Sequence, residues 1–289
     1  MRPDVVHLLS NNVLWLNLAV PLWGAVPLIT TVHDVITHPG DRETSAIPAW
    51  STRLILRQSD HLVVHGPKLR EHAVQLFGKP GNAVHVLAHP SIQRYAAIAA
   101  KEAMQPRDPD GFNVLLFGRV YRYKGLEHLI RAEALLGERV RGLRITIAGR
   151  GDDARSLHRL MGDPGRYEVC NRFIPDAEVA QLFVDADVVV LPYVEASQSG
   201  VLNIAATFGK PVIVTDVGEL GATVEPAGIG LVVPPADPER LANAIARLAG
   251  SRPLRQSLGL SARCWAEGVN APETVGARAA ELYTRVARQ

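Results

Sequence analysis

The chain has 289 residues, 47% of them hydrophobic and 21% charged, which is typical of a globular protein with room for two domains. Its 31 Lys and Arg nearly balance its 29 Asp and Glu, so the charge gives no reason to expect nucleic-acid binding. Its two cysteines, Cys170 and Cys264, have no metal-ligand spacing, so they support neither a zinc site nor a disulfide framework and favour a reduced, cytoplasmic compartment.

The first part of the chain predicts a strand in "DVVHLL", an apolar helix around residues 13–20 and a strand in "PLITTVHD". The apolar stretch 13–29 is interrupted by an asparagine, prolines and a glycine, and it falls short of the roughly 20 apolar residues of a membrane span. Asp4 close behind Arg2 disfavours a signal peptide. The apolar stretch and a pI near 8.6 permit peripheral contact with the inner face of a membrane without requiring it.

Short β-branched runs then alternate with helical patterns along the chain. The predicted strands are "HLVVHG", "AVHVLAH", "NVLLFG", "LRITIAG", "YEVCNRFI", "DVVVLPY", "PVIVTD" and "GLVVPP". The predicted helices cover residues 67–78, 126–136, 153–161, 176–184, 201–208, 237–250 and 272–288, and a polar linker covers 101–111. Such alternation indicates a parallel sheet with helical crossovers, so we expect a doubly wound α/β fold.

The loop "FGRVYRYKG", residues 117–125, follows a buried strand and carries Arg119 and Lys124 before a helix. Open α/β sheets bind ligands at the carboxyl ends of their strands, where helix N-termini offer unpaired N–H groups. An arginine and a lysine there are able to neutralise a diphosphate without a metal. A solvated basic loop explains the two residues equally well.

A second loop, "AGRGD" at residues 148–152, has glycines that let the backbone turn tightly or approach a ligand closely. Ala154 replaces the third glycine of the G-x-G-x-x-G pattern that begins at Gly149, so dinucleotide binding is disfavoured. We expect Asp152 to cap the helix that follows.

The third loop lies in "PYVEASQSGVLNIAATFGKPVIVTD", residues 192–216. The backbone N–H groups of Ser199, Gly200 and Val201 stand where a helix begins and are able to converge on a phosphate. Glu195, one turn earlier, is placed to accept hydrogen bonds from ligand hydroxyls. The alternative is that Ser199 only caps a helix and that Glu195 is an ordinary surface acid.

Four stretches of the chain resemble the nucleotide-sugar-binding half of the retaining family 4 glycosyltransferases. They are "LLFGRVYRYKGLEHLI", "LRITIAGRGD", "FVDADVVVLPYVEASQSGVLNIAATFGKPVIVTDVGEL" and "GIGLVVPPADPERLANAIARL". The resemblance runs in consistent order over residues 112–250 and more weakly through "PDVVHLL", "PLITTVHD" and "HLVVHGPKLREHAVQLFG". It implies an α/β chain with the GT-B fold, which has two Rossmann-like doubly wound domains, here with the N-terminal one incomplete.

The resemblance also implies a donor site. Arg119 and Lys124 match the family's diphosphate-binding pair, and Glu195 matches the first glutamate of its E-x7-E motif, which contacts the donor sugar. Ser199, Gly200 and Val201 match the phosphate-contacting helix start, Gly149 belongs to the same site, and backbone groups from Arg172 to Ile174 are expected to meet the base. His33, in "TVHD", matches a histidine that lies over the sugar in many members, although a structural turn histidine fits its position as well.

Two departures from the family pattern stand out. Asn203 and Ile204 occupy the place of the second glutamate, which usually holds the ribose; the Asn203 amide keeps hydrogen-bonding capacity but lacks the charge. The sequence also opens in mid-domain, so about 100 residues remain for a domain expected nearer 150.

We therefore expect a partial acceptor-side domain over residues 1–106 and a nucleotide-sugar-binding domain over 107–271. A helix over residues 272–289 is expected to pack back on the first domain. An incomplete domain leaves apolar sheet edges exposed, so we expect an oligomer or a partner that covers them.

The expected activity is metal-independent transfer of a hexose, with retention of configuration, from a nucleoside diphosphate sugar to a glycan, lipid-linked or small-molecule acceptor, without a cofactor. Arg119 and Lys124 would stabilise the departing diphosphate, Glu195 would orient the sugar and His33 would close the other side. One alternative is a non-catalytic nucleotide-sugar-binding subunit or an inactive truncated form. Another is a GT-B nucleotide-sugar epimerase, for which paired carboxylates are not evident.

Overall fold

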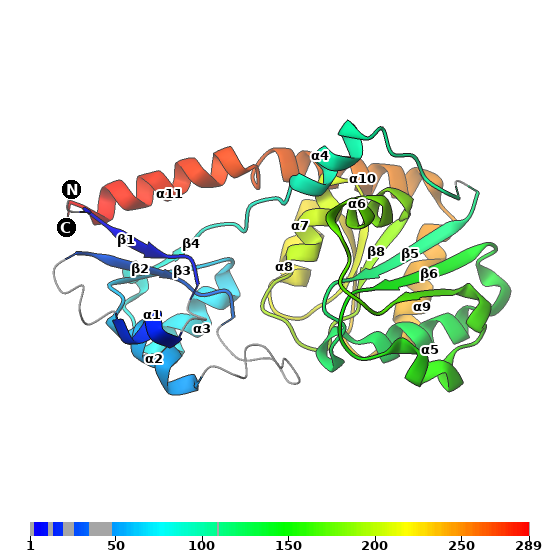
Figure 1. Ribbon diagram of the computed structural model, residues 1–289, viewed down its shortest axis with the longest axis horizontal. Coiled ribbons are helices and arrows are strands. Elements are labelled where there is room, and N and C mark those ends of the chain that lie inside the picture. Colours follow the sequence, from blue (N-terminus) through cyan, green and yellow to red (C-terminus); the bar gives the residue numbers. More distant parts are fainter. Residues whose placement is uncertain (1–2, 11–13, 20–25, 35–47, 109, 289) are drawn as a thin grey trace. The chain divides into compact units, whose positions relative to one another are not determined.

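The computed structural model describes residues 3–10, 14–19, 26–34, 48–108 and 110–288. The chain divides into two compact units, one made of Met1–His89 with Val269–Gln289 and the other of Pro90–Gly268 (Figure 1). Residues 90–106, which we expected in the first domain, thus lie in the second unit. They do so because helix α4 (Arg94–Lys101) packs against α6 (Asp176–Asp185).

The first unit contains a four-stranded parallel sheet in the order β1-β2-β3-β4. Its strands are β1 (Val6–Leu8), β2 (Leu28–Thr31), β3 (His61–Val64) and β4 (Val84–Val86). They lie within the strands predicted from the sequence, because runs of valine, isoleucine and leucine suit a buried pleated surface.

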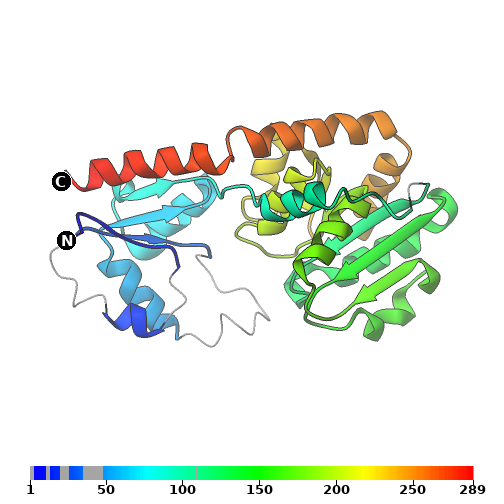
Figure 2. The same ribbon diagram turned by 45° about the horizontal axis from the view of Figure 1, so that its top comes forward.

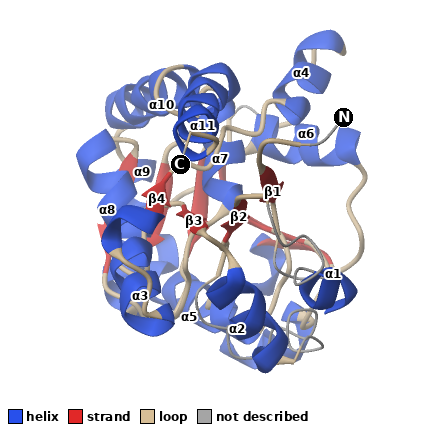
Figure 3. Ribbon diagram, turned by 90° about the vertical axis from the view of Figure 1, so that its left-hand side faces the viewer, coloured by secondary structure: helices blue, strands red, loops and turns tan. Residues whose placement is uncertain are grey.

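Helices cover both faces of this sheet, as Figure 3 shows for α2 and α3 on one side and α11 on the other. The helices of the first unit are α1 (Leu14–Ala19), α2 (Ala49–Gln58), α3 (Pro67–Phe77) and α11 (Pro272–Val286). Successive strand residues point to opposite faces. Leu62 therefore lies in the core with residues of α2 and α3, whereas Val63 packs with Leu282 and Val286 of α11.

The second unit contains a six-stranded parallel sheet in the order β10-β9-β8-β5-β6-β7. Its strands are β5 (Phe112–Phe117), β6 (Leu143–Ala148), β7 (Tyr167–Cys170), β8 (Val188–Leu191), β9 (Val212–Thr215) and β10 (Gly230–Val233). The expected parallel sheet is confirmed. The chain starts in the centre of the sheet at β5, moves out to β7, and returns through β8 to the opposite edge.

Helices lie on both faces of this sheet (Figure 1 and Figure 2), and a hydrophobic core fills the space between the sheet and each layer of helices. On one face lie α5 (Leu126–Leu136) and α9 (Pro238–Ala249), and on the other α6, α7 (Gly200–Thr207) and α8 (Leu220–Ala227). Helix α10 (Arg252–Glu267) packs along α7 and adds Ala262 and Ala266 to the second core.

A buried carboxylate organises the approach to β7. Glu133 of α5 is fully buried, and its oxygens accept hydrogen bonds from the Gly162 N–H at 2.8 Å, Arg166 Nη1 at 3.0 Å and the Tyr167 hydroxyl at 3.0 Å. Burial and the adjacent carboxylate raise the pKa of Tyr167. The single side chain of Glu133 thus holds the turn that leads into β7.

Several elements were not anticipated from the sequence, namely helices α2, α4, α8 and α10. The helix expected over residues 153–161 is a 3₁₀ helix over Ala154–Leu160. The apolar helix expected around residues 13–20 is the short α1, and residues 13 and 20 themselves lie outside the described part of the chain. Within that part, every helix is too short or too polar to traverse a bilayer.

Candidate functional site

Three loops leave the carboxyl ends of β5, β6 and β8, and these strands are neighbours in the sheet. They comprise residues 118–125, 149–153 and 192–199. The three loops singled out in the sequence are therefore adjacent. Parallel α/β sheets bind ligands at this edge.

The first two loops touch through their backbones. The Gly118 N–H donates to the Ala148 carbonyl at 3.0 Å, and the Val120 N–H donates to the Arg150 carbonyl at 2.7 Å. Gly149 has a φ of 141°, and a Cβ atom there would lie 1.9 Å from the Gly118 carbonyl oxygen. The neighbouring loop is what requires a glycine at this position.

The first and third loops are joined in the same way. Gly125 has a φ of 70°, and a Cβ atom there would lie 1.8 Å from the Pro192 carbonyl oxygen. The Val194 N–H donates to the Tyr123 carbonyl at 2.9 Å. Lys124 is thereby held beside the third loop.

A tyrosine that the sequence analysis did not single out connects the two loops chemically. Lys124 Nζ lies 3.8 Å from the ring centroid of Tyr193, which is 1% exposed, and 5.1 Å from that of Tyr123. The Tyr193 hydroxyl shares a 3.1 Å hydrogen bond with Ser199 Oγ. Tyr193 therefore contacts both the Lys124 ammonium, through its ring, and the start of α7, through its hydroxyl. The only feature of the sequence that pointed to Tyr193 is its position just after β8.

Ser199 is the N-cap of α7, and its Oγ accepts a hydrogen bond from the Val201 N–H at 3.3 Å. Gly200 is the first residue of the helix. Asn203 is 3% exposed and donates from Nδ2 to the Ser199 carbonyl at 3.4 Å. The capping role of Ser199 is confirmed, and Ser199, Gly200, Val201 and Asn203 all lie together at this helix start.

Arg119 and Glu195 lie on the two facing loops and differ in exposure. Arg119 is exposed between Gly118 and Val120, whereas Glu195 is half-buried. Gln198, beside Ser199, has a buried Oε1 that accepts no hydrogen bond from the described residues. That oxygen is a ready acceptor for a ligand hydroxyl or N–H, and no motif marked it in the sequence.

The expected base-binding segment follows β7. Ile174 is 6% exposed and its side chain belongs to the core, so only its backbone is available to a ligand. Phe173 is 62% exposed, and Arg150 Cζ lies 5.2 Å from its ring centroid. This stacked pair at the edge of the loops is a third feature missed in the sequence.

The loop after β9 contacts the backbone of the third loop. Gly218 has a φ of 51°, and a Cβ atom there would lie 2.0 Å from the Ala196 carbonyl oxygen. The Glu219 N–H donates to the Ser197 carbonyl at 3.0 Å, and Thr215 Oγ1 donates to the Tyr193 carbonyl at 2.5 Å. The peptide backbone around Glu195 is thus fixed on two sides.

The expected cap at Asp152 is wrong. Asp153 is the N-cap of the 3₁₀ helix, and its carboxylate accepts from the Arg155 N–H at 3.0 Å. The Asp152 N–H instead donates to the Val120 carbonyl at 2.6 Å, which ties this residue to the first loop. Because Asp152 and Asp153 are consecutive, the sequence alone did not show which of the two caps the helix.

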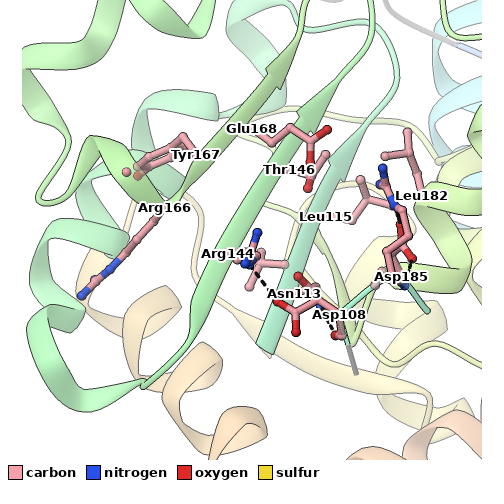
Figure 4. A pocket seen from close by; sticks show the side chains of 14 residues that line it. Asp108, Asn113, Leu115, Arg144, Thr146, Arg166, Tyr167, Glu168, Leu182 and Asp185 are labelled. Atoms are coloured by element: carbon pink, nitrogen blue, oxygen red, sulfur yellow. Dashed lines mark hydrogen bonds and ion pairs between the residues drawn. The ribbon is translucent and has the colours of Figure 1, made fainter. Parts of the chain in front are cut away.

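A cavity of about 390 Å³ opens elsewhere in the second unit (Figure 4). Its walls include Asn113 and Arg144 near the starts of β5 and β6, and Asp185 at the end of α6. The three loops contribute none of its described lining residues, so this cavity is separate from the candidate site.

His33 belongs to the first unit, where it follows β2. Its Nε2 lies 2.8 Å from the Leu9 carbonyl oxygen and its Nδ1 lies 3.1 Å from Nε2 of His65. His65, which follows β3, was not singled out in the sequence. The other nine predicted site residues belong to the second unit.

Two family models match the chain. One described as "Glycosyl transferase 4-like domain" matches residues 1–89, and one described as "Glycosyl transferases group 1" matches residues 111–251. The boundary between them falls close to the boundary between the two units.

Among curated proteins, the D-inositol 3-phosphate glycosyltransferase of Corynebacterium diphtheriae is 29% identical over 91% of this chain and 66% of its own length. Sucrose-phosphate synthase from Thermosynechococcus elongatus has a similar structure, with a TM-score of 0.77 and 21% identity over 98% of this chain and 73% of its own. Anabaena Alr3699/HepE in complex with UDP gives a TM-score of 0.77 and 18% identity over 98% of this chain and 79% of its own. The chain spans 59–66% of the length of the curated relatives compared.

Proposed function

Because the chain contains a glycosyl transferase 4-like domain followed by a glycosyl transferases group 1 domain in the GT-B fold, we propose that it transfers a sugar from a nucleoside diphosphate sugar to an acceptor. The named relative is a glycosyltransferase, and the Anabaena neighbour is a complex with UDP. The proposal extends both properties to this chain.

The observation that carries the proposal is the convergence of Lys124, Tyr193 and Ser199 at the carboxyl edge of the sheet. An ammonium and a helix start on facing loops form a site for a doubly charged phosphate group. The backbone contacts at Gly125 and Gly149 keep the loops in place before a ligand arrives. Such preorganisation is what makes electrostatic stabilisation of a leaving group effective.

In the proposed reaction, the bond between the sugar and the diphosphate breaks as the acceptor oxygen bonds to the same carbon, and the proton of the acceptor hydroxyl passes to the departing diphosphate. Arg119 and Lys124 stabilise the negative charge on the departing diphosphate, so no metal is needed for that role. Glu195 and Gln198 hold sugar hydroxyls, and Asn203 replaces a carboxylate at the ribose. We propose retention of configuration and hexose transfer on the family resemblance alone.

A non-catalytic nucleotide-sugar-binding protein is the second candidate, favoured by Asn203. A neutral amide binds a ribose hydroxyl more weakly than a carboxylate, because hydrogen bonds to charged groups are about twice as strong. Weaker donor binding is compatible with a chain that holds a nucleotide sugar but transfers it slowly.

The decisive experiment has two steps. Calorimetry with UDP, GDP and ADP, and with their glucose or mannose derivatives, should show one nucleotide series binding in the micromolar range. Incubation of the preferred donor with labelled acceptors in EDTA, followed by NMR of the product anomer, should then show transfer with retention. Failure of every nucleotide to bind would refute both candidates, and binding without transfer or donor hydrolysis would select the second.

A further inference from the structure

Three histidines gather at the carboxyl edge of the four-stranded sheet. His33 follows β2, His65 follows β3 and His89 follows β4. The ring centroids of His33 and His65 are 5.0 Å apart, and those of His65 and His89 are 5.2 Å apart. The function proposed above uses none of them, and the family resemblance singled out only His33.

His33 and His65 form a hydrogen-bonded chain that ends on a carbonyl oxygen at each side. His33 Nε2 lies 2.8 Å from the Leu9 oxygen, and His65 Nδ1 lies 3.0 Å from the Leu87 oxygen. Between the rings, His33 Nδ1 and His65 Nε2 are 3.1 Å apart. A carbonyl oxygen can only accept, so the two outer nitrogens must both carry hydrogen.

This arrangement does not work with two neutral rings. A neutral imidazole has one N–H, and in each ring that N–H is already committed to a carbonyl. The two inner nitrogens would then face each other as lone pairs at 3.1 Å. One additional proton between them turns this repulsive contact into a charge-assisted hydrogen bond.

We propose that His33 carries this second proton on Nδ1 and donates it to Nε2 of neutral His65, so that the pair holds one positive charge at the sheet edge. His65 is then a positioning residue, which fixes the ring orientation and the protonation of His33. Burial lowers the pKa of His65 to about 4, so His65 is the neutral partner.

The charged neighbours of the pair come from the ends of β2 and β4. Asp34 raises the pKa of His65, whereas His89 and the charge on His33 lower it. Asp34 thus favours positive charge in this cluster, and His89 opposes it. The carbonyls of Leu9 and Leu87 add two acceptor dipoles at the ends of the chain.

A second histidine pair in the same unit provides an internal control. His85 Nε2 lies 3.1 Å from His61 Nδ1, the same separation as in the first pair. The difference is at the end of the chain, where Arg285 Nη2 donates towards His85 Nδ1 at 3.5 Å. Hydrogen bonds then run in one direction from Arg285 through His85 to His61, and no additional proton is required.

A glutamine at position 65 removes the need for the additional proton, because its amide can donate to a bare His33 Nδ1 as well as accept from a protonated one.

The test is long-range ¹H–¹⁵N NMR of the histidine side chains of the full chain at pH 6.5. We expect both nitrogens of His33 protonated, His65 neutral with its proton on Nδ1, and the His61–His85 pair with one proton on each ring. In His65→Gln, His33 should become neutral with its proton on Nε2, whereas His61→Gln should leave His33 unchanged.

A wild-type His33 with a single proton would overturn the proposal, and this measurement does not depend on any variant folding or on enzyme activity. Correct spectra without transfer at any pH would refute the proposed function and leave the protonated pair intact.

Discussion

The two units hold the carboxyl edges of their sheets by different means. In the six-stranded unit, glycines let one loop backbone lie directly against the next, as at Gly149 and Gly125. In the four-stranded unit, the rings of His33 and His65 span the strand ends through hydrogen bonds. The first edge is therefore fixed by steric fit and is insensitive to pH, whereas the second depends on where protons reside.

The largest effect is expected from Gly149→Ala, which disturbs the backbone contact between the first two loops of the six-stranded unit. The new methyl group would meet the Gly118 carbonyl at 1.9 Å, at a φ of 141° that side chains rarely adopt. We expect the free energy of unfolding to drop by about 4 kcal/mol, measured by urea denaturation. Gly276→Ala, at an open position of α11, is the control and should not destabilise the chain. A Gly149→Ala protein as stable as wild type would show that this edge yields easily.

Glu133→Gln tests whether the second unit also depends on a buried charge. The amide cannot accept from Gly162, Arg166 and Tyr167 at once, and Arg166 loses its buried partner. We expect a loss of about 3 kcal/mol in the free energy of unfolding. Glu138→Gln, at a carboxylate whose side chain is 99% exposed, should leave stability unchanged. Equal effects of the two substitutions would contradict the importance of burial.

Lys124→Ala removes the ammonium from the preorganised edge without touching its backbone. The loss of a charge-assisted contact of about 1.5–3 kcal/mol should lower transfer roughly ten- to hundredfold. The control is Arg122→Ala, an exposed basic residue in the same turn. Steady-state kinetics with the preferred donor would decide, and equal loss in both variants would indicate that only the general charge of the loop matters.

Acidification should distinguish the two units. Burial lowers the pKa of His65 and of His85 to about 4 each, below the ordinary value of 6.5. Their neutral forms therefore contribute stability that is complete above pH 6.5 and is lost as the pH falls towards 4.

Hydrogen exchange, corrected for its intrinsic pH dependence, should show protection of β3 and β4 falling about tenfold from pH 7 to pH 4, which is about 1.4 kcal/mol. Protection of β5 and β8 should change less, and His85→Gln should reduce the difference. Parallel losses in both units would refute the contrast between them.

The smallest effect is expected from Tyr193→Phe. The ring under Lys124 and the Ser199 cap of Val201 both remain, and only the 3.1 Å hydrogen bond to Ser199 Oγ is lost. The affinity for the nucleoside diphosphate should fall about fivefold by calorimetry, which is about 1 kcal/mol. A fall as large as in Lys124→Ala would mean that the hydroxyl itself contacts the ligand. Tyr121→Phe serves as the control.

Local patterns were enough to predict most of the fold. Every strand of the six-stranded sheet overlaps a stretch that the sequence predicted as a strand, and α9 begins at its predicted aspartate cap. The missed helices carry contrary signals. Pro226 lies inside α8, and Gly259 lies inside α10, where a Cβ atom would be 2.3 Å from the Gly209 carbonyl oxygen.

The site was less predictable, because its members come from distant parts of the chain. The loops around Lys124 and Ser199 could be recognised from strand ends and charge, but their connection through Tyr193 depends on β5 and β8 being neighbours. The partnership of His33 and His65 likewise depends on the register of β2 with β3. Spacing along one sequence does not encode such cross-strand encounters.

The contact between Gly125 and Pro192 also constrains how this scaffold can be re-engineered. The two backbones lie too close together there to leave room for a side chain at position 125, so the two segments must have matching backbone conformations. A chimera that imports residues 118–125 from a relative with another sugar preference should fail unless residues 192–199 come with them. A change of sugar specificity in this scaffold would then require both loops to be exchanged together, because neither loop fits without its partner.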